Sequence, residues 1–148
     1  MEIHLGNISH IIQLAIAPVF LLTGVGTNLT VLTNRLARII DRTRVLEDRM
    51  RATGTENPDA LDELRTLFRR AHLINRAITL STSCALLICL VIATLFIGGA
   101  LELSLAKVIA LLFVLAMLSL IGSFVYLLRE IFLATRTLSM RHVLFHQR

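Results

Sequence analysis

The sequence predicts an all-α, polytopic membrane protein with three transmembrane helices, the first and second extended into a cytoplasmic antiparallel helical hairpin. Hydrophobic residues fill 55% of its 148 positions, above the roughly 45–50% found in globular domains. Three stretches, 5–34, 77–101 and 108–128, contain no Asp, Glu, Lys or Arg. About 20 apolar residues are enough for a helix to cross the hydrocarbon layer. We therefore treat residues 1–148 as a single membrane domain.

The first span is expected at residues 8–34. Pro18 removes one backbone hydrogen bond of this helix and predicts a kink. Beyond it, the segment up to Arg44 contains no further Pro and no Gly after Gly26. Because nothing interrupts the pattern, we predict one helix that leaves the membrane near Asn34 and continues into water.

The segment 35–76 is expected to form the cytoplasmic hairpin. Both of its arms show the 3,4 spacing of apolar residues that is typical of coiled coils. The breaker-rich stretch TGTENP, residues 53–58, separates the arms. The first arm carries the stripe Leu36, Ile39, Thr43, Leu46 and Met50, and the second carries Leu61, Leu64, Phe68, Ala71, Asn75 and Ile78.

The second span is expected at residues 77–99, where Gly98 and Gly99 form a turn signal. The third is expected at 103–128, ended by Arg129 and Glu130. Since the connection is short, these two spans should be antiparallel neighbours. The remaining tail, 129–148, is expected to be either a basic amphipathic helix on the inner leaflet or a disordered segment.

The basic residues predict the topology. Ten of the 15 Lys and Arg residues lie between Arg35 and Arg76, four lie at or beyond Arg129, and only Lys107 lies elsewhere. Basic residues that flank spans stay in the cytoplasm. We therefore expect the N-terminus outside, and the hairpin and C-terminus in the cytoplasm. Seven acidic residues interleave with the ten basic ones of the hairpin, so we expect no nucleic-acid partner.

A polar line on the first span is the most specific feature for function. Its members lie within about 60° of one helix face, namely Thr23, Thr27, Thr30 and Asn34. Hydroxyls and amides in this arrangement could line a hydrated path in an oligomer. Arg35, Arg38 and Asp41 would then form the cytoplasmic vestibule.

Helix packing is the competing explanation for these polar residues. Thr hydroxyls bond readily to the preceding turn of their own helix, and small or polar residues favour contacts between membrane helices. We expect such packing contacts at a second set of residues, Gly24, Asn28, Asn75, Thr79 and Ser123.

Other functional classes receive little support. No ionisable residue lies near the middle of a span, which argues against a proton-coupled transporter. Phosphate-binding, HExxH and GxSxG motifs are missing from the sequence, so we expect no enzyme. His142 and His146 offer only two ligands, whereas a closed zinc site uses four. We therefore expect no metal and no cofactor.

The segment Ile11–Glu47 resembles a known family, and the three-span layout of the remainder is compatible, so the resemblance covers most of the chain. The segment A-P-x-F-L-L-x-G-x-G, residues 17–26, is followed by L-T-N-R-L-A-R-I-x-D-R-x-R, residues 32–44. In this respect the sequence is similar to small bacterial membrane proteins of the domain of unknown function 2721 family. The resemblance implies a location in the bacterial inner membrane, and it transfers no catalytic or binding residue.

Two functions follow as hypotheses. The first is a homo-oligomeric channel or pore, for ions, lined by the polar face of the first span. The second is a non-conducting scaffold or regulator that recruits a cytoplasmic protein partner through its coiled hairpin at 35–76. In both, the lipid bilayer surrounds the spans.

Overall fold

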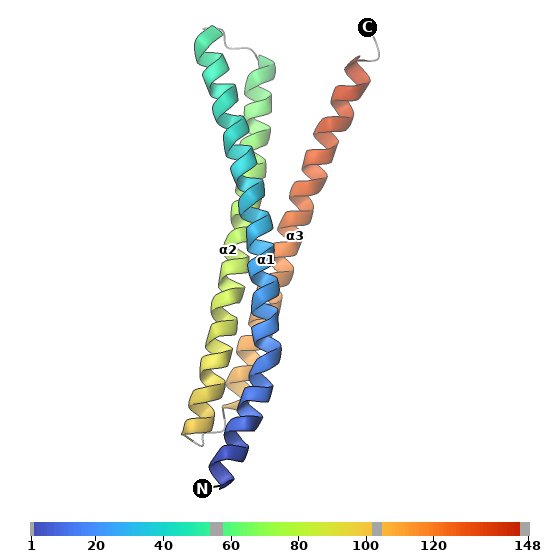
Figure 1. The fold of residues 1–148 in the computed structure, drawn as a ribbon. Helices are drawn as coiled ribbons and strands as arrows, with labels where there is room; N and C mark the ends of the chain where they lie inside the picture. Colours follow the sequence, from blue (N-terminus) through green and yellow to red (C-terminus); the bar gives the residue numbers. More distant parts are fainter. Residues whose placement is uncertain (1, 54–57, 102–104, 146–148) are drawn as a thin grey trace. The chain divides into compact units, whose positions relative to one another are not determined.

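Three long α-helices make up the fold. The computed structural model describes residues 2–53, 58–101 and 105–145, and the side chains of 9–52, 58–101 and 105–135. The helices are α1 (Glu2–Thr53), α2 (Pro58–Ala100) and α3 (Ala106–Phe145) (Figure 1). Helix is the regular secondary structure of all the described residues except those at the turns. The predicted all-helical class is confirmed.

Each of the three helices is long and apolar enough to cross a membrane, judged by length and composition. Many of their large apolar side chains point outward, including Phe20 with 74% of its surface exposed and Leu86 with 62%. An exposed apolar surface of this kind is costly in water and favourable against lipid tails. The chain therefore has the make-up of a multi-pass membrane protein.

The chain divides into two compact units, and each helix contributes to both. We call the first the apolar unit, made of Met1–Thr30 and Thr79–Gly122. We call the second the basic unit, made of Val31–Ile78 and Ser123–Arg148, which holds most of the arginines. Each unit has its own buried cluster.

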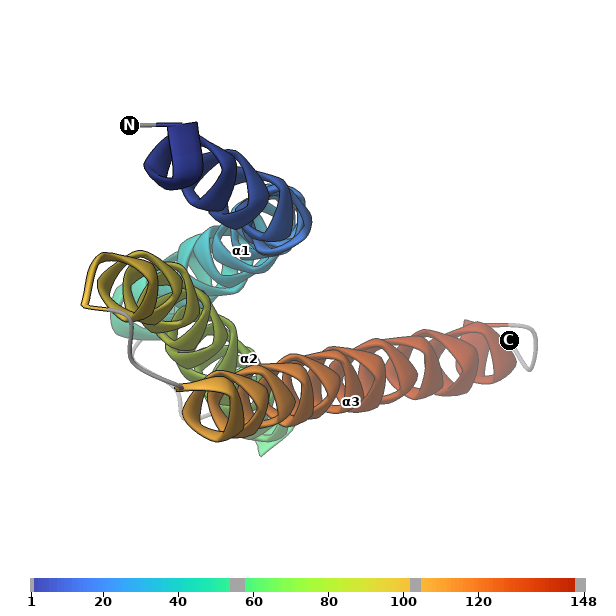
Figure 2. The same cartoon turned by 90° about the horizontal axis from the view of Figure 1, so that it is seen from below.

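In the apolar unit, all three helices contribute small and branched side chains to one cluster. Figure 2 shows the ribbon of the chain from the side on which α1 begins. The buried cluster of the apolar unit contains Val25, Cys84, Ile88, Ala116 and Leu120. Ala116 has no exposed surface, so α3 approaches its neighbours closely there. A side chain at Gly122 would meet Leu80 Cδ1 at 3.0 Å, which indicates a second close approach, between α3 and α2.

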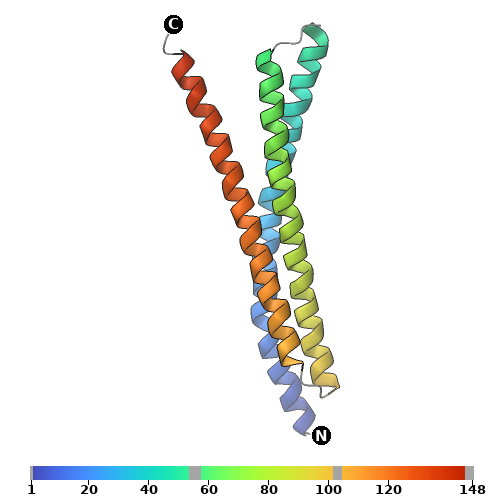
Figure 3. The ribbon, with the colours of Figure 1, turned by 180° about the vertical axis from the view of Figure 1, so that it is seen from behind.

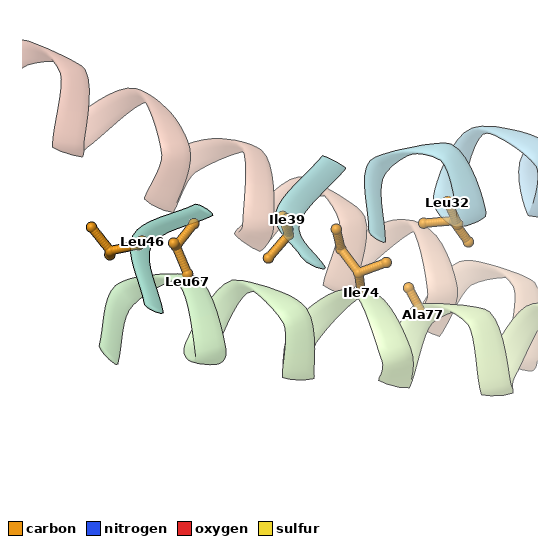
Figure 4. Packing of buried hydrophobic residues seen from close by; sticks show 6 residues of the cluster. All are labelled: Leu32, Ile39, Leu46, Leu67, Ile74 and Ala77. Carbon is orange, nitrogen blue, oxygen red and sulfur yellow. The ribbon is translucent and has the colours of Figure 1, made fainter. Parts of the chain in front are cut away.

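The basic unit pairs the second half of α1 with the first half of α2, which lie side by side in Figures 1 and 3. Figure 4 shows the six fully packed side chains between them. They are Leu32, Ile39, Leu46, Leu67, Ile74 and Ala77. Tyr126 and Leu127 of α3 pack against the same cluster.

The buried face of α2 agrees in part with the stripe that the spacing indicates. Leu64, Ala71 and Ile78 of that stripe pack against the buried cluster.

The other three members of the stripe, Leu61, Phe68 and Asn75, are exposed. Leu67 and Ile74, each one position earlier than Phe68 and Asn75, are buried instead.

Pro18 lies inside α1, which continues from Glu2 to Thr53. One further difference concerns the end of a helix. The third helix continues past Arg129 and Glu130 to Phe145, so the described part of the tail is helix continuous with the third span. Arg and Glu are good helix formers, and Glu130 is neutralised by partners on the other two helices. Because the charge of Glu130 is compensated, α3 can continue past this residue.

The packing predicts different costs for two neighbouring apolar residues of α2. Ile74 has no exposed surface, whereas 57% of Phe68 is exposed. We expect Ile74→Ala to lower the free energy of unfolding by about 2–5 kcal/mol, since it leaves a cavity in the core. Phe68→Ala should cost less than about 1 kcal/mol. Thermal unfolding of the detergent-solubilised variants measures both, and the reverse order would place Phe68 in the buried stripe.

Candidate functional site

The centre of the site is a carboxylate buried between two guanidinium groups. Only 1% of the Glu130 side chain is exposed. Its Oε1 accepts hydrogen bonds from Arg70 Nε at 3.1 Å and Arg70 Nη2 at 2.9 Å. Its Oε2 accepts a hydrogen bond from Arg35 Nη1. We call these three residues the ion triad, and within the basic unit they join α1, α2 and α3.

The ion triad explains how a carboxylate can be buried at this position. An isolated buried charge is strongly unfavourable, and a buried pair is tolerated only with good geometry and satisfied hydrogen bonds. Glu130 has both, because three charge-assisted hydrogen bonds reach its two oxygens. With two cations around one anion, the ion triad keeps a net positive charge.

The sequence positions of the ion triad lie close to the ends of the uncharged stretches. Arg35 is the first charged residue after 5–34, and Glu130 is the second after 108–128. Ser123, two helical turns before Glu130, donates a hydrogen bond to the carbonyl of Ala77, two turns after Arg70. The two contacts therefore share one antiparallel register of α2 and α3 within the basic unit.

A pocket of about 360 Å³ opens beside the ion triad, and all its walls belong to the basic unit. Its charged lining comes from Arg35, Arg38, Arg42, Arg70 and Glu130, and Thr135 is its one uncharged polar member. Arg42 is held by Glu63 at 2.8 and 3.1 Å. Arg38 has no ion-pair partner among the residues that the structure describes. Four guanidinium groups thus face two carboxylates, and the pocket is electropositive.

The predicted pore-lining residues lie on an exposed edge of α1. The hydroxyls of Thr23, Thr27 and Thr30 donate to carbonyls four residues earlier, at 3.4, 3.1 and 3.1 Å. Asn34 is also exposed, in the basic unit. Among the described residues of the apolar unit, none buries Thr23, Thr27 or Thr30.

The predicted packing residues fall into two groups. Asn28 is buried and donates to Ser81 Oγ at 2.8 Å, and Ser123 is buried against α2. Asn75 and Thr79 are exposed. Gly24 is exposed as well, and a side chain there would meet nothing within 4 Å. The close approach expected at Gly24 is therefore not made by this chain's own helices.

The predicted vestibule residues also separate. Arg35 and Arg38 both line the pocket, whereas Asp41 is exposed and is no part of its lining.

Sequence reasoning missed Glu130, Arg70 and Arg42 as site residues. A signal existed for Glu130, which is the only acidic residue after Glu102 and follows a long apolar stretch. No such signal distinguishes Arg70 from its neighbour Arg69.

Metal binding finds no support in the described part of the chain, which holds no group of three or more His, Cys, Asp or Glu side chains that could share an ion. The site is a cluster of charged side chains within the three helices, just beyond their uncharged stretches. Such a fold and site define a multi-pass α-helical membrane protein whose basic unit contains a buried ion triad.

Comparison with known families gives one result. The family model described as a protein of unknown function (DUF2721) matches residues 15–140. The chain belongs to this family, as the motif between residues 17 and 44 predicts. No curated protein and no solved structure matches the chain.

The ion triad predicts unequal effects for two arginines. We expect Arg70→Ala to lower the free energy of unfolding by about 3 kcal/mol, because it leaves a buried carboxylate with one hydrogen-bonding partner. The matched control is Arg42→Ala, whose partner Glu63 is 28% exposed, and it should cost at most about 1 kcal/mol. Unfolding midpoints of the two solubilised variants provide the measurement.

A double variant separates the ion triad from mere packing. Once Glu130 is also changed to Ala, the loss of Arg70 should cost much less than it does alone. Strict additivity of the two changes would contradict the ion triad.

Proposed function

We propose that the protein forms a homo-oligomeric channel or pore, for ions, lined by the polar face of its first span. The observation that carries this proposal is the exposed polar edge of α1. Thr23, Thr27 and Thr30 are all exposed in the single chain, although they lie within the longest uncharged stretch of the sequence. An edge of this kind can face water or a neighbouring helix, and in the proposed pore it faces water.

The hydrogen bonding of this edge is compatible with water. Each Thr hydroxyl uses its proton on its own helix, and its oxygen can still accept a bond from water. In a symmetric ring of first spans, these oxygens would form successive polar rings. Gly24 and Gly26 offer no side chain and have open space around them, which would let a neighbouring copy approach closely.

The charged end of the edge supports the same arrangement. Arg35, Arg38 and Asp41 follow Asn34 within two turns, and they would set the electrostatic field at the inner mouth. The proposal includes the topology that the basic residues favour, with the N-terminus outside and the C-terminus in the cytoplasm. It also includes a bacterial inner membrane, which the family resemblance implies.

Ion flux into vesicles tests the pore. We expect Thr27→Val to reduce flux several-fold, because it removes one polar group per subunit without a change of shape. The control is Thr94→Val, since Thr94 makes the same bond to a carbonyl four residues earlier, at 2.7 Å, but on α2. Equal flux from protein-containing and empty vesicles, or a purified monomer, would contradict the proposal.

A second candidate function is a non-conducting scaffold or regulator that recruits a cytoplasmic protein. Leu61 and Phe68 favour it. They lie two turns apart on the same face of α2, outside the uncharged stretches, and are 39% and 57% exposed. Apolar side chains exposed in this way often mark protein contacts.

The variant Leu61→Ser with Phe68→Ser tests the scaffold. It leaves the buried Leu67 and Ile74 in place, so we expect the fold to persist. If the scaffold function is correct, a partner that co-purifies in stoichiometric amount with the wild type should be lost from this variant. Retention of the partner would exclude this face as the contact.

A further inference from the structure

The basic pocket has features that a pore lining does not require. It lies between α1, α2 and α3 within the basic unit, and it contains the only described ionic contacts that join three helices. We propose that this pocket binds a phosphate group, of the kind that an anionic lipid carries in its headgroup. This inference does not depend on the proposed pore.

The charge of the pocket selects an anion. Two of its guanidinium groups share the carboxylate of Glu130, and a third is held by Glu63. Arg38 lines the pocket and is exposed, without an ion-pair partner in the described residues. A bound anion would compensate this charge. It would also reduce the repulsion among arginines that lie around a single buried carboxylate.

Hydrogen-bond donors are available for a phosphate. Arg35 uses Nη1 on Glu130, which leaves Nε and Nη2 free of that contact. No described residue forms an ion pair with the guanidinium group of Arg38. A guanidinium group presents five donors in a planar fork that matches two phosphate oxygens. Two such groups, one helical turn apart on α1, are a suitable pair for one phosphate.

Apart from Thr135, the uncharged part of the lining is apolar and suits a lipid. Its apolar members come from all three helices, namely Ile39, Leu67, Ile131 and Ala134. Arg35 directly follows the first uncharged stretch, so if α1 spans the bilayer the pocket lies at headgroup depth. Basic pockets between helices on the cytoplasmic side are a known setting for lipid headgroups. These features favour a lipid over a soluble phosphate.

Native mass spectrometry of the full-length, detergent-solubilised protein tests the proposal. The probes are phosphatidylglycerol, whose headgroup is anionic, and phosphatidylcholine, which is the zwitterionic control. We expect the wild type to retain phosphatidylglycerol in preference to phosphatidylcholine. Equal retention of the two lipids would overturn the proposal.

Two arginines of α1 provide the matched variants. Arg38→Gln should weaken phosphatidylglycerol binding about tenfold, equivalent to about 1.4 kcal/mol. Arg44→Gln removes the same charge from an exposed arginine of α1 that does not line the pocket, and should leave binding nearly unchanged. Equal weakening by the two variants would show non-specific attraction and overturn the site. Unchanged unfolding midpoints verify that both variants are folded.

Competition with inorganic phosphate identifies the source of the phosphate group. If phosphate displaces the lipid from the wild type but not from a weakened Arg38→Gln variant, the pocket recognises the phosphate itself. If it fails to displace the lipid, the apolar lining contributes and the ligand is the lipid. Both results support a phosphate site.

Flux measurements are independent of lipid binding, so retained lipid without flux would contradict the pore alone.

Discussion

The buried carboxylate of Glu130 is the constraint on which the basic unit depends. It can be buried only because Arg35 and Arg70 reach it from the other two helices, and an unpaired charge there would be strongly unfavourable. A hydrophobic seam tolerates a shift in register, because one aliphatic residue replaces another at small cost. Charged groups with directed hydrogen bonds do not. The ion triad thus fixes the register of the unit, while the apolar cluster that includes Ile39 and Ile74 supplies the hydrophobic contact.

Polar contacts have the same role in the apolar unit, at a smaller scale. Asn28 donates to Ser81, and Ser119 donates to the carbonyl of Leu80 at 2.7 Å. Such bonds average only about 0.6 kcal/mol in membrane proteins, so their value lies in specificity rather than in strength. No buried side-chain nitrogen or oxygen of the described residues lacks a hydrogen-bond partner. The polar residues that remain exposed, among them Thr23 and Thr27, are therefore not needed to hold the three helices together.

Sequence reasoning reached the helices but not their contacts. The lengths of the uncharged stretches predict three long apolar helices because the hydrocarbon layer sets one dimension. Periodicity could not choose between Leu61 with Phe68 and Leu67 with Ile74, since α2 is apolar at both. Glu130 was missed because its role needs two residues that are 60 and 95 positions away in the sequence. A one-dimensional pattern contains the spacing along a helix but not the partner across it.

In the basic unit, the charged residues of α1 lie on two different faces of the helix. Arg35 is turned toward Glu130, while Asp41 is exposed away from the pocket. The acid that could have balanced Arg38 from its own helix therefore does not line the pocket, and the positive charge there stays uncompensated by the described residues. An uncompensated guanidinium beside an ion-paired one is unfavourable unless water or an anion meets it. If α1 spans a bilayer, the anions near the end of its uncharged stretch are lipid phosphates. The same arrangement of charges that fixes the helices thus also leaves an electropositive pocket in which an anion would be favourable.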